Sequence, residues 1–511
     1  MFIKSKIFRD TAILTVMQLF LDTAALLLNV FITKQLGTSA IGILALMGSF
    51  LVLAGTISNG NAFLCTSRLI SEELGKKDSN PNGVLFHGVK FCVILSIAVS
   101  AILLLFAEPF SCRFFSGVQM ASTIRLMPAA LISGAISGCL KGYFNASRKA
   151  SVAAAGDIME FTVKSAVIII MTLAAENPDE GTVCGIMIGS IIAGNIFSLI
   201  YFLAAYIKLH KRYTGKCSLS FRQYASFAFP IMGGGILTSV LSSTNDALIP
   251  MCLRQYGNSV SEALSRFGIF EAIVIPTLFF PSVVLCSMSG IIVSESARAA
   301  AAGNAERIKS IASRLIEWTL MYAIISAAVL IRFGDLIGEL LGGGELAGRM
   351  ITVIAPVVPF IYMEIVLEAL IKGMGQQAFS SLNYLAEYVI RISVVLILVP
   401  RIGFYGIVAS YYASNVIGNC SRFIKLLRTT GMEFRPLKLV FLPILYSFLT
   451  MNAAELFTNI AASEGKNIIT MVVMTVLWVL GYFGIYGALC KIRLFDIKRE
   501  LNLFKINNNR A

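Results

Sequence analysis

Runs of 18 or more apolar residues recur along nearly the whole length of this 511-residue chain. A helix needs about 20 apolar residues to cross a hydrocarbon layer about 30 Å thick, so each run is long enough to span a membrane. Charged residues make up only 14% of the chain, against about 25% in soluble domains. The sequence therefore predicts an all-α polytopic membrane protein.

The apolar runs divide into fourteen predicted spans, separated by short polar or glycine-containing segments. The spans are expected at residues 11–33, 39–66, 85–107, 122–141, 150–174, 183–207, 224–246, 264–294, 312–331, 348–371, 378–400, 404–427, 437–457 and 467–490.

The chain is expected to have three parts. A basic linker near residue 212 separates an N-terminal six-helix lobe, residues 1–212, from a C-terminal six-helix lobe, residues 213–430. Residues 431–511 add two transmembrane helices and a basic interfacial tail. The tail is predicted at 491–511 because apolar residues recur there at helical spacing among Lys and Arg residues.

Lysine and arginine fall mainly on one side of the predicted membrane. The two termini and alternate loops hold about thirty of the 42 Lys and Arg residues, and the positive-inside rule assigns that side to the cytoplasm. Both termini are therefore expected in the cytoplasm, at a bacterial-type cell membrane. A basic face beside anionic membrane lipids accounts for the net charge of +14 without a nucleic-acid partner.

The predicted span at 150–174 carries charged residues in its middle. Asp157, Glu160 and Lys164 are spaced three and four apart, so they form one stripe along a helix. From a start near Ser151, Glu160 lies about 14 Å and Lys164 about 20 Å along that helix, near the bilayer midplane. Charges at this depth are costly and mark functional sites, but a pair that only locks the helix into its bundle explains them as well.

The second half of the chain repeats this pattern. Glu387-Tyr-Val-Ile-Arg391 aligns with Glu160-Phe-Thr-Val-Lys164, and each copy follows a Lys-Gly turn and continues into an apolar run. A duplicated membrane bundle is a common plan of secondary transporters. We therefore predict a substrate cavity lined by Asp157, Glu160, Lys164, Asn383, Glu387 and Arg391.

Three acids in other spans are candidates for coupling transport to a cation or a proton. Asp22, Asp246 and Glu271 lie inside the predicted first, seventh and eighth spans. Glu364 and Glu368, in the tenth span, are weaker candidates for the same role.

The sequence carries no motif for enzymatic chemistry. It lacks the P-loop pattern Gly-x-x-x-x-Gly-Lys-Ser/Thr, and its two histidines offer neither a catalytic triad nor a histidine-based metal site. Its ten cysteines are scattered, so neither disulfides nor a metal centre are assigned. We expect no enzyme activity and no cofactor, and transport driven by H+, Na+, the membrane potential or the substrate's own gradient.

Several stretches, taken in order, resemble the multidrug/oligosaccharidyl-lipid/polysaccharide exporter (MOP) superfamily. The resemblance is to its polysaccharide-biosynthesis branch, which holds stage V sporulation protein B and the MurJ-type lipid II flippases. The stretches are Ile32-Thr-Lys-Gln-Leu-Gly-Thr-Ser-Ala-Ile-Gly42, Arg68-Leu-Ile-Ser-Glu-Glu-Leu-Gly75, Leu140-Lys-Gly-Tyr-Phe144, Glu160-x-x-x-Lys164, Asn245-Asp-Ala-Leu-Ile-Pro250 and Phe280-Pro-Ser282.

This resemblance implies a V-shaped, MATE-like bundle of two pseudo-symmetric lobes around a cavity with alternating access. It implies a lipid-linked glycan or cell-wall precursor of the undecaprenyl-pyrophosphate type, moved from the inner to the outer leaflet. Lys164 and Arg391 would receive the pyrophosphate. MurJ-type flippases carry basic residues in the first helix, whereas this chain has Gln18, Asp22 and Asn29 there.

Two other functions remain open. A cation-coupled multidrug or toxin antiporter of the same superfamily would use Asp22, Asp246 and Glu271 in an acidic cavity. A non-transporting scaffold of envelope assembly would use the midplane charges for stability alone. The paired bases favour the flippase, which we expect to act as a monomer.

Overall fold

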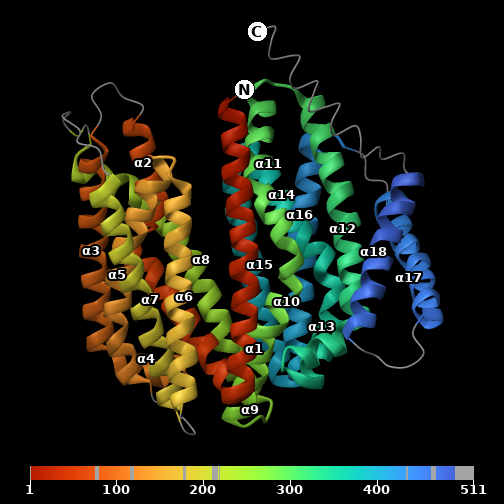
Figure 1. Ribbon diagram of the computed structural model, residues 1–511, viewed down its shortest axis with the longest axis horizontal. Helices are drawn as coiled ribbons and strands as arrows, with labels where there is room; N and C mark the ends of the chain where they lie inside the picture. Colours follow the sequence, from red (N-terminus) through yellow and green to blue (C-terminus); the bar gives the residue numbers. More distant parts are fainter. Residues whose placement is uncertain are drawn as a thin grey trace. The chain divides into compact units, whose positions relative to one another are not determined.

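The computed structural model consists of long helices joined by short turns (Figure 1). Every regular element within the described residues is a helix, and this confirms the predicted all-α fold class. The predicted interfacial tail at 491–511 lies outside the described residues. These are residues 2–74, 80–115, 120–175, 180–209, 217, 219–432, 436–461 and 468–489.

The chain packs as two compact units, each built from three segments. Unit 1 comprises Met1–Ser287, Gly338–Ala347 and Leu385–Ser414. Unit 2 comprises Met288–Ile337, Gly348–Tyr384 and Asn415–Ala511. The lobe boundaries expected from the sequence stay predictions.

The first eight helices cover the first seven predicted spans, with α4 as a short helix that was not predicted. The predicted turn between the first two spans is a break inside α1 at Gly37, whose φ of 85° favours glycine. These helices are α1 (Phe2–Asn59), α2 (Ala62–Leu74), α3 (Pro81–Leu105), α4 (Ala107–Phe114), α5 (Ala121–Ala146), α6 (Ala150–Ala174), α7 (Glu180–Leu209) and α8 (Phe221–Gln255).

The remaining helices are interrupted more often, by π-helical and 3-10 turns. The predicted eighth span is five consecutive elements, and its proline residues lie at the joints between them. The elements are α9 (Val260–Ile269), η1 (Phe270–Val274), α10 (Ile275–Phe279), η2 (Phe280–Ser282), α11 (Val283–Ala301), α12 (Ala305–Leu340), α13 (Gly344–Ile354), η3 (Ala355–Val357), α14 (Val358–Gly373), α15 (Gln377–Ile402), α16 (Phe404–Thr430), η4 (Leu437–Phe441), α17 (Leu442–Ala461) and α18 (Ile468–Leu489).

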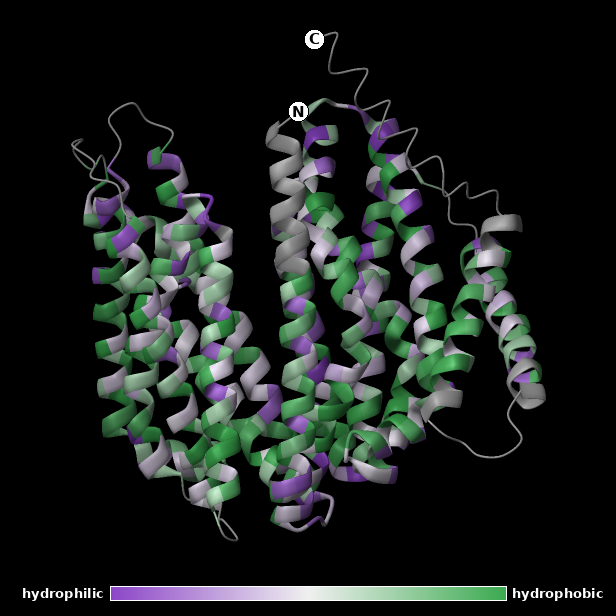
Figure 2. Cartoon of the chain, in the orientation of Figure 1, coloured by the Kyte–Doolittle hydropathy of each residue, from purple (hydrophilic) through white to green (hydrophobic). Residues whose placement is uncertain are grey.

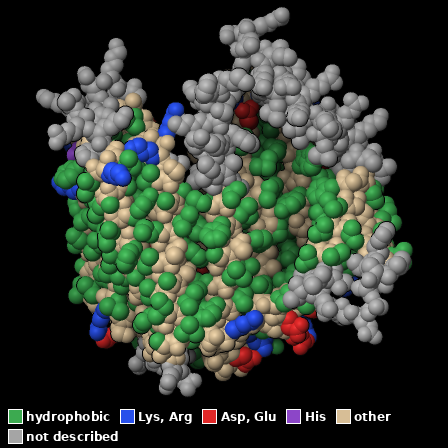
Figure 3. Space-filling model, in the orientation of Figure 1, with side chains coloured by type: hydrophobic (Ala, Val, Ile, Leu, Met, Phe, Trp, Pro, Cys, Tyr) green, Lys and Arg blue, Asp and Glu red, His purple; other side chains and the backbone are tan. Residues whose placement is uncertain are grey.

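Within the part of the chain that the structure describes, ten helical segments are long and apolar enough to cross a membrane, and the protein is a multi-pass membrane protein. Hydrophobic residues run along most of each helix in Figure 2 and cover most of the face shown in Figure 3. Helix α6 has the bounds predicted for the fifth span, but it is not among the ten because Asp157, Glu160 and Lys164 all lie in its middle.

The predicted span at 39–66 is two helices rather than one. Gly60 and Asn61 have positive φ angles of 54° and 55°, which end α1 and allow α2 to start in a new direction. The Asn59 side chain accepts a hydrogen bond of 2.8 Å from the first N–H of α2, and the Cys92 thiol donates to the Asn59 carbonyl at 3.2 Å. Side chains thus replace the backbone bonds lost at the break, as a backbone in hydrocarbon requires.

Two glycines allow α1 and α9 to meet backbone to backbone within unit 1. A Cβ atom at Gly268 would lie 2.6 Å from the Cα of Gly42, and a Cβ atom at Gly42 would collide with the carbonyl of Leu264. Both positions therefore need glycine for space rather than for an unusual φ angle. Because neither glycine has a side chain, the backbone of α1 lies directly against that of α9, the helix that leads into η1.

The last two described helices, α17 and α18, lie side by side in unit 2 (Figure 1). The indole N–H of Trp478 on α18 donates to the Ser447 carbonyl of α17 at 2.8 Å. The hydroxyl of Tyr482 donates to the Met321 carbonyl of α12 at 3.1 Å, and the Arg332–Glu455 ion pair joins α12 to α17 at 3.1 Å. The two helices predicted to follow the twelve-helix core are therefore bonded to each other and to α12.

The contact between α1 and α9 predicts a steep cost for one added methyl group. We expect Gly42→Ala to lower stability by at least about 1–3 kcal/mol, the usual cost of overpacking, because the new methyl group meets backbone that cannot move aside. Thermal unfolding in detergent micelles measures the loss. Gly48→Ala on the same helix is the matched control, since its Cβ would find only the terminal methyl group of Met187 at 3.6 Å. Equal stability of the two variants would contradict the prediction.

Candidate functional site

Glu271 lies in the π-helical turn η1, between α9 and α10. The N–H of Ile275 bonds to the carbonyl of Phe270, five residues back instead of the four of an α-helix. Turns of this kind are rare and occur frequently at functional sites. The Glu271 side chain is half-buried, and among the described residues its carboxylate has no hydrogen-bond partner.

Asp246 lies on α8 and is held by α1. Its carboxylate accepts a hydrogen bond of 2.6 Å from the Ser49 hydroxyl and one of 3.3 Å from the Asn245 side-chain amide. The Ser243 hydroxyl donates in turn to the Ser49 carbonyl at 2.9 Å. With a relative exposure of 9%, Asp246 is a carboxylate fixed in the interior of unit 1 rather than at a helix end.

Arg391 on α15 provides the positive charge of the same region. Its guanidinium carbon lies 4.4 Å from the ring centre of Tyr411 and 5.2 Å from that of Tyr388, within cation–π range. Its Nε donates to the Ser414 hydroxyl at 3.0 Å. Electrostatic interactions link Arg391 to both Asp246 and Glu271, and link the two acids to each other.

The structure thus brings together three of the predicted site residues in unit 1, from both predicted classes. Asp246, Glu271 and Arg391 form a group of two carboxylates and one guanidinium, which we call the acid–arginine cluster. Two carboxylates beside one guanidinium have one more negative charge than positive charge, which a proton or a small cation can balance. A guanidinium also binds phosphate oxygens bidentately. The cluster therefore contains a group that can bind an anionic substrate and groups that can bind a cation.

The charged stripe of α6 is present, but its ion pairing differs from the expected one. Lys141 of α5 binds Asp157 with its Nζ 2.7 Å from the carboxylate. Among the described side chains, Glu160 and Lys164 do not form an ion pair, although both are half-buried. They lie against α7 at Gly194, where a Cβ would be 3.3 Å from the Cβ of Lys164 and 2.9 Å from the Glu160 carbonyl. Spacing of four placed them on one face, but packing against α7 sets the direction of each side chain.

The other predicted site residues lie on α15 and α1. Glu387 is buried on α15, with 5% of its surface exposed. Asn383, one turn earlier, belongs to unit 2 and donates to the Gly418 carbonyl of α16 at 3.2 Å. Asp22 is half-buried on α1 and accepts a hydrogen bond of 2.8 Å from Gln18. Their roles in a cavity or in coupling stay predictions.

Unit 2 holds a charged group that the sequence reasoning missed. Arg422 on α16 is fully buried, with its Nε 3.2 Å from Glu368 and its Nη2 3.4 Å from Glu364, both on α14. Ser380 also donates to Glu368, and Lys372 lies 3.0 Å from the same carboxylate. The signal was the pair Glu364 and Glu368, four apart inside one span, which needs a cation from a neighbouring helix.

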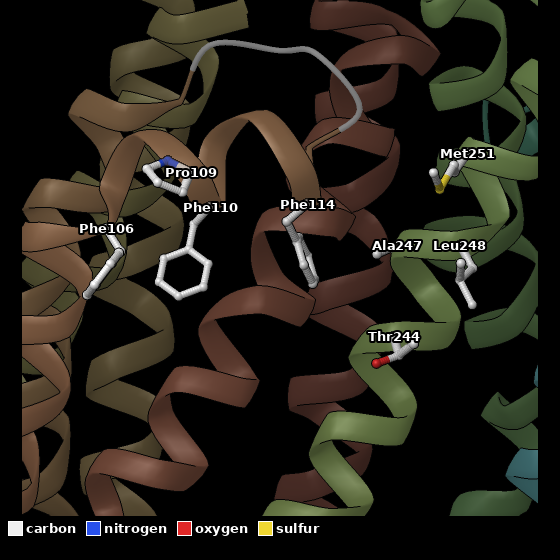
Figure 4. Close-up of a pocket in the computed structure, with 8 residues that line it drawn as sticks. All are labelled: Phe106, Pro109, Phe110, Phe114, Thr244, Ala247, Leu248 and Met251. Carbon is white, nitrogen blue, oxygen red and sulfur yellow. The ribbon is translucent and has the colours of Figure 1, made fainter.

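A cavity of about 460 Å³ lies in unit 1, between α4 and one face of α8 (Figure 4). None of its eight lining residues is charged, and none is a predicted site residue, so the cavity is not lined by the acid–arginine cluster. Among the described residues, no three His, Cys, Asp or Glu side chains are arranged to hold a metal ion. The cavity is lined by Phe106, Pro109, Phe110, Phe114, Thr244, Ala247, Leu248 and Met251.

The chain is similar to a known protein in sequence and to solved structures in fold. No protein-family model matches the chain. Stage V sporulation protein B of Bacillus subtilis (strain 168) is 20% identical over 494 residues, which cover 94% of this chain and 93% of that protein. The chain is therefore similar to that protein along nearly its whole length.

Solved structures of membrane transporters share the fold of this chain. The lipid II flippase MurJ, in an inward closed conformation, matches with a TM-score of 0.66 and 14% identity over 93% of this chain and 98% of MurJ. A multidrug resistance MATE family transporter of the MOP superfamily, in an inward-facing conformation, matches with a TM-score of 0.61 and 14% identity over 81% of this chain and 96% of its own. These likenesses confirm the predicted fold, and the sequence similarity to stage V sporulation protein B agrees with the resemblance found in the sequence. None of the three proteins is named as an enzyme.

The buried ion pairs of Arg422 predict a large stability effect. We expect Arg422→Met to destabilise the protein by about 3 kcal/mol, because it leaves Glu364 without its cation and Glu368 with Lys372 alone. The loss is measured by thermal unfolding in detergent. Arg422→Met combined with Glu364→Gln and Glu368→Gln should recover most of it. Arg68→Met, which removes the exposed Arg68–Glu72 pair, is the control and should cost no more than about 1 kcal/mol. If Arg422→Met were as stable as Arg68→Met, the ion pairs of Arg422 would not be needed for stability.

Proposed function

We propose that the protein is a flippase, which moves a lipid-linked glycan or cell-wall precursor from the inner to the outer leaflet by alternating access. Two findings support this proposal: similarity along the whole chain to a sporulation protein, and the fold of a lipid II flippase. A pyrophosphate headgroup cannot cross hydrocarbon unaided, because a charge is strongly favoured in water. The protein must therefore offer it cations inside the membrane.

The observation that carries the proposal is the position of Arg391. It is a guanidinium inside unit 1, stacked on Tyr411 and balanced by Asp246 and Glu271. Before substrate binds, the two acids and the aromatic rings limit the desolvation cost of this cation. A pyrophosphate oxygen pair offers the guanidinium the same bidentate partner as a carboxylate. Lys164 on α6 supplies the second base of the proposed headgroup site.

We further propose that the acid–arginine cluster couples this movement to H+ or Na+. When Arg391 turns to the pyrophosphate, Asp246 and Glu271 lose their counter-charge, and two neighbouring carboxylates in low dielectric take up a cation to replace it. Asp246 already has two hydrogen-bond donors. Glu271 has none among the described residues and is therefore the group that we assign to cation exchange.

A cation-coupled drug antiporter is the second candidate function. The excess of acids over bases in the acid–arginine cluster favours it, as does the likeness to a multidrug MATE transporter. In that case the cationic drug replaces the coupling ion at Asp246 and Glu271, and Arg391 has no anionic substrate to bind.

The flippase is tested with proteoliposomes that contain a fluorescent undecaprenyl-pyrophosphate-linked sugar. Loss of fluorescence to an external quencher reports its arrival in the accessible leaflet. We expect Arg391→Met and Lys164→Met each to slow movement about tenfold or more, the loss expected when one charge-assisted hydrogen bond to the headgroup is removed. Arg391→Lys should retain part of the rate, because it keeps the charge and loses only the planar fork.

Arg125→Met is the matched control, since Arg125 forms an exposed pair with Glu108 and should transport at the wild-type rate. No protein-dependent movement of any lipid-linked sugar, together with cation-driven dye efflux, would replace the flippase by the antiporter. Wild-type transport and stability in Glu160→Gln/Lys164→Met would remove α6 from the site.

A further inference from the structure

The π-helical turn that carries Glu271 leaves the carbonyl of Ala272 without its helical donor. In an α-helix this carbonyl would accept a hydrogen bond from the N–H of residue 276. That residue is Pro276, which has no N–H. A carbonyl without a donor is costly in hydrocarbon, where no water replaces the missing bond.

The missing donor comes from the first helix. The side-chain amide of Asn29 on α1 donates to the Ala272 carbonyl at 3.0 Å, across 243 positions of sequence. Asn29 is itself fixed on its helix, because the Thr33 hydroxyl donates to the Asn29 carbonyl at 2.7 Å. This bond ties the residue immediately after Glu271 to a helix that also contributes Ser49 to Asp246.

We propose that Asn29 is a positioning residue for Glu271: its amide holds the π-helical turn in the register that directs this carboxylate toward Asp246 and Arg391, the other two members of the acid–arginine cluster. The inference rests on the proposed function, in which Glu271 exchanges the coupling cation. Asn29 acts through the backbone and does not touch the substrate.

The register matters because successive helical residues differ by about 100° around the axis. A shift of η1 by one residue would turn Glu271 away from the groups that face it, and another side chain would take its place. Those groups come from three elements: Asp246 on α8, Arg391 on α15 and Tyr411 on α16. The hydrogen bond to the Ala272 carbonyl therefore also fixes the orientation of the Glu271 carboxylate.

The decisive test restores the missing donor by another route. Asn29→Ala should slow translocation of the undecaprenyl-pyrophosphate-linked sugar about tenfold per folded protein, since one buried hydrogen bond and the register that it holds are lost. Pro276→Ala supplies a backbone N–H to the Ala272 carbonyl. The double variant Asn29→Ala/Pro276→Ala should therefore return to within about threefold of the wild-type rate.

Asn195→Ala is the matched control for a purely structural loss. Asn195 on α7 donates its amide to the Ala130 carbonyl of α5 at 2.9 Å, the same kind of interhelical bond at a distance from Glu271. Its loss should lower the unfolding temperature about as much as Asn29→Ala does and leave transport per folded protein unchanged. Equal loss of rate in the two single variants, or a double variant as slow as Asn29→Ala, would overturn the proposal.

A second readout does not depend on transport. A hydrophobic carbodiimide reacts with carboxyl groups in apolar cavities, and mass spectrometry locates the adduct. We expect Glu271 labelling to fall at least about threefold in Asn29→Ala, which has lost the bond that holds its register, and to recover in the double variant. If the three proteins label in this pattern but the wild-type protein moves no lipid-linked sugar, the proposed function is wrong and the role of Asn29 stands. Unchanged labelling in Asn29→Ala would overturn the role of Asn29, whatever the wild-type protein transports.

Discussion

In this protein, every backbone carbonyl inside the membrane that a helix does not satisfy must find a donor from another side chain. Hydrocarbon offers no water, so an interruption of a helix survives only where such a donor exists. Cys92 donates to the Asn59 carbonyl at the end of α1, and Asn29 donates to the Ala272 carbonyl beside Glu271. These two interruptions are therefore tied to a second helix, which fixes the direction of the groups next to them.

The same low dielectric organises the charges into balanced groups. Arg422 has two carboxylates and no exposed surface, which makes it a structural cation of unit 2. Arg391 has two acidic neighbours of a different kind, since Asp246 is held by hydrogen bonds and the Glu271 carboxylate has none among the described residues. An acid without fixed partners can change its protonation or bind a cation with little rearrangement. This contrast separates a group that stabilises the fold from one that can take part in transport.

Hydropathy predicted the position of most of the long helices, because about 20 apolar residues are required for each crossing whatever the fold, but it missed the break at Gly60 and the short helix α4. Helix α6 begins and ends where the sequence indicated. Pairing between charges was harder to predict. The spacing of Glu160 and Lys164 suggested an ion pair, but the bond observed on that helix joins Lys141 to Asp157. Arg391 meets acids from α8 and η1, far away in the sequence, so only tertiary packing brings them together. The π-helical turn left no periodic signal, because it adds a single residue to a helix that is otherwise regular.

The meeting of Gly42 and Gly268 has a consequence for how α1 and α9 can move. Helices that interlock through large side chains must change rotamers before they slide or separate, and each such change takes place against close packing. At Gly42 and Gly268 the two backbones meet with no side chain between them, so no rotamer at these two positions has to change when the helices shift. The closest approach between α1 and α9 therefore holds the two helices together without interlocking side chains at that point, so it opposes a small sliding movement less than a contact between large side chains would.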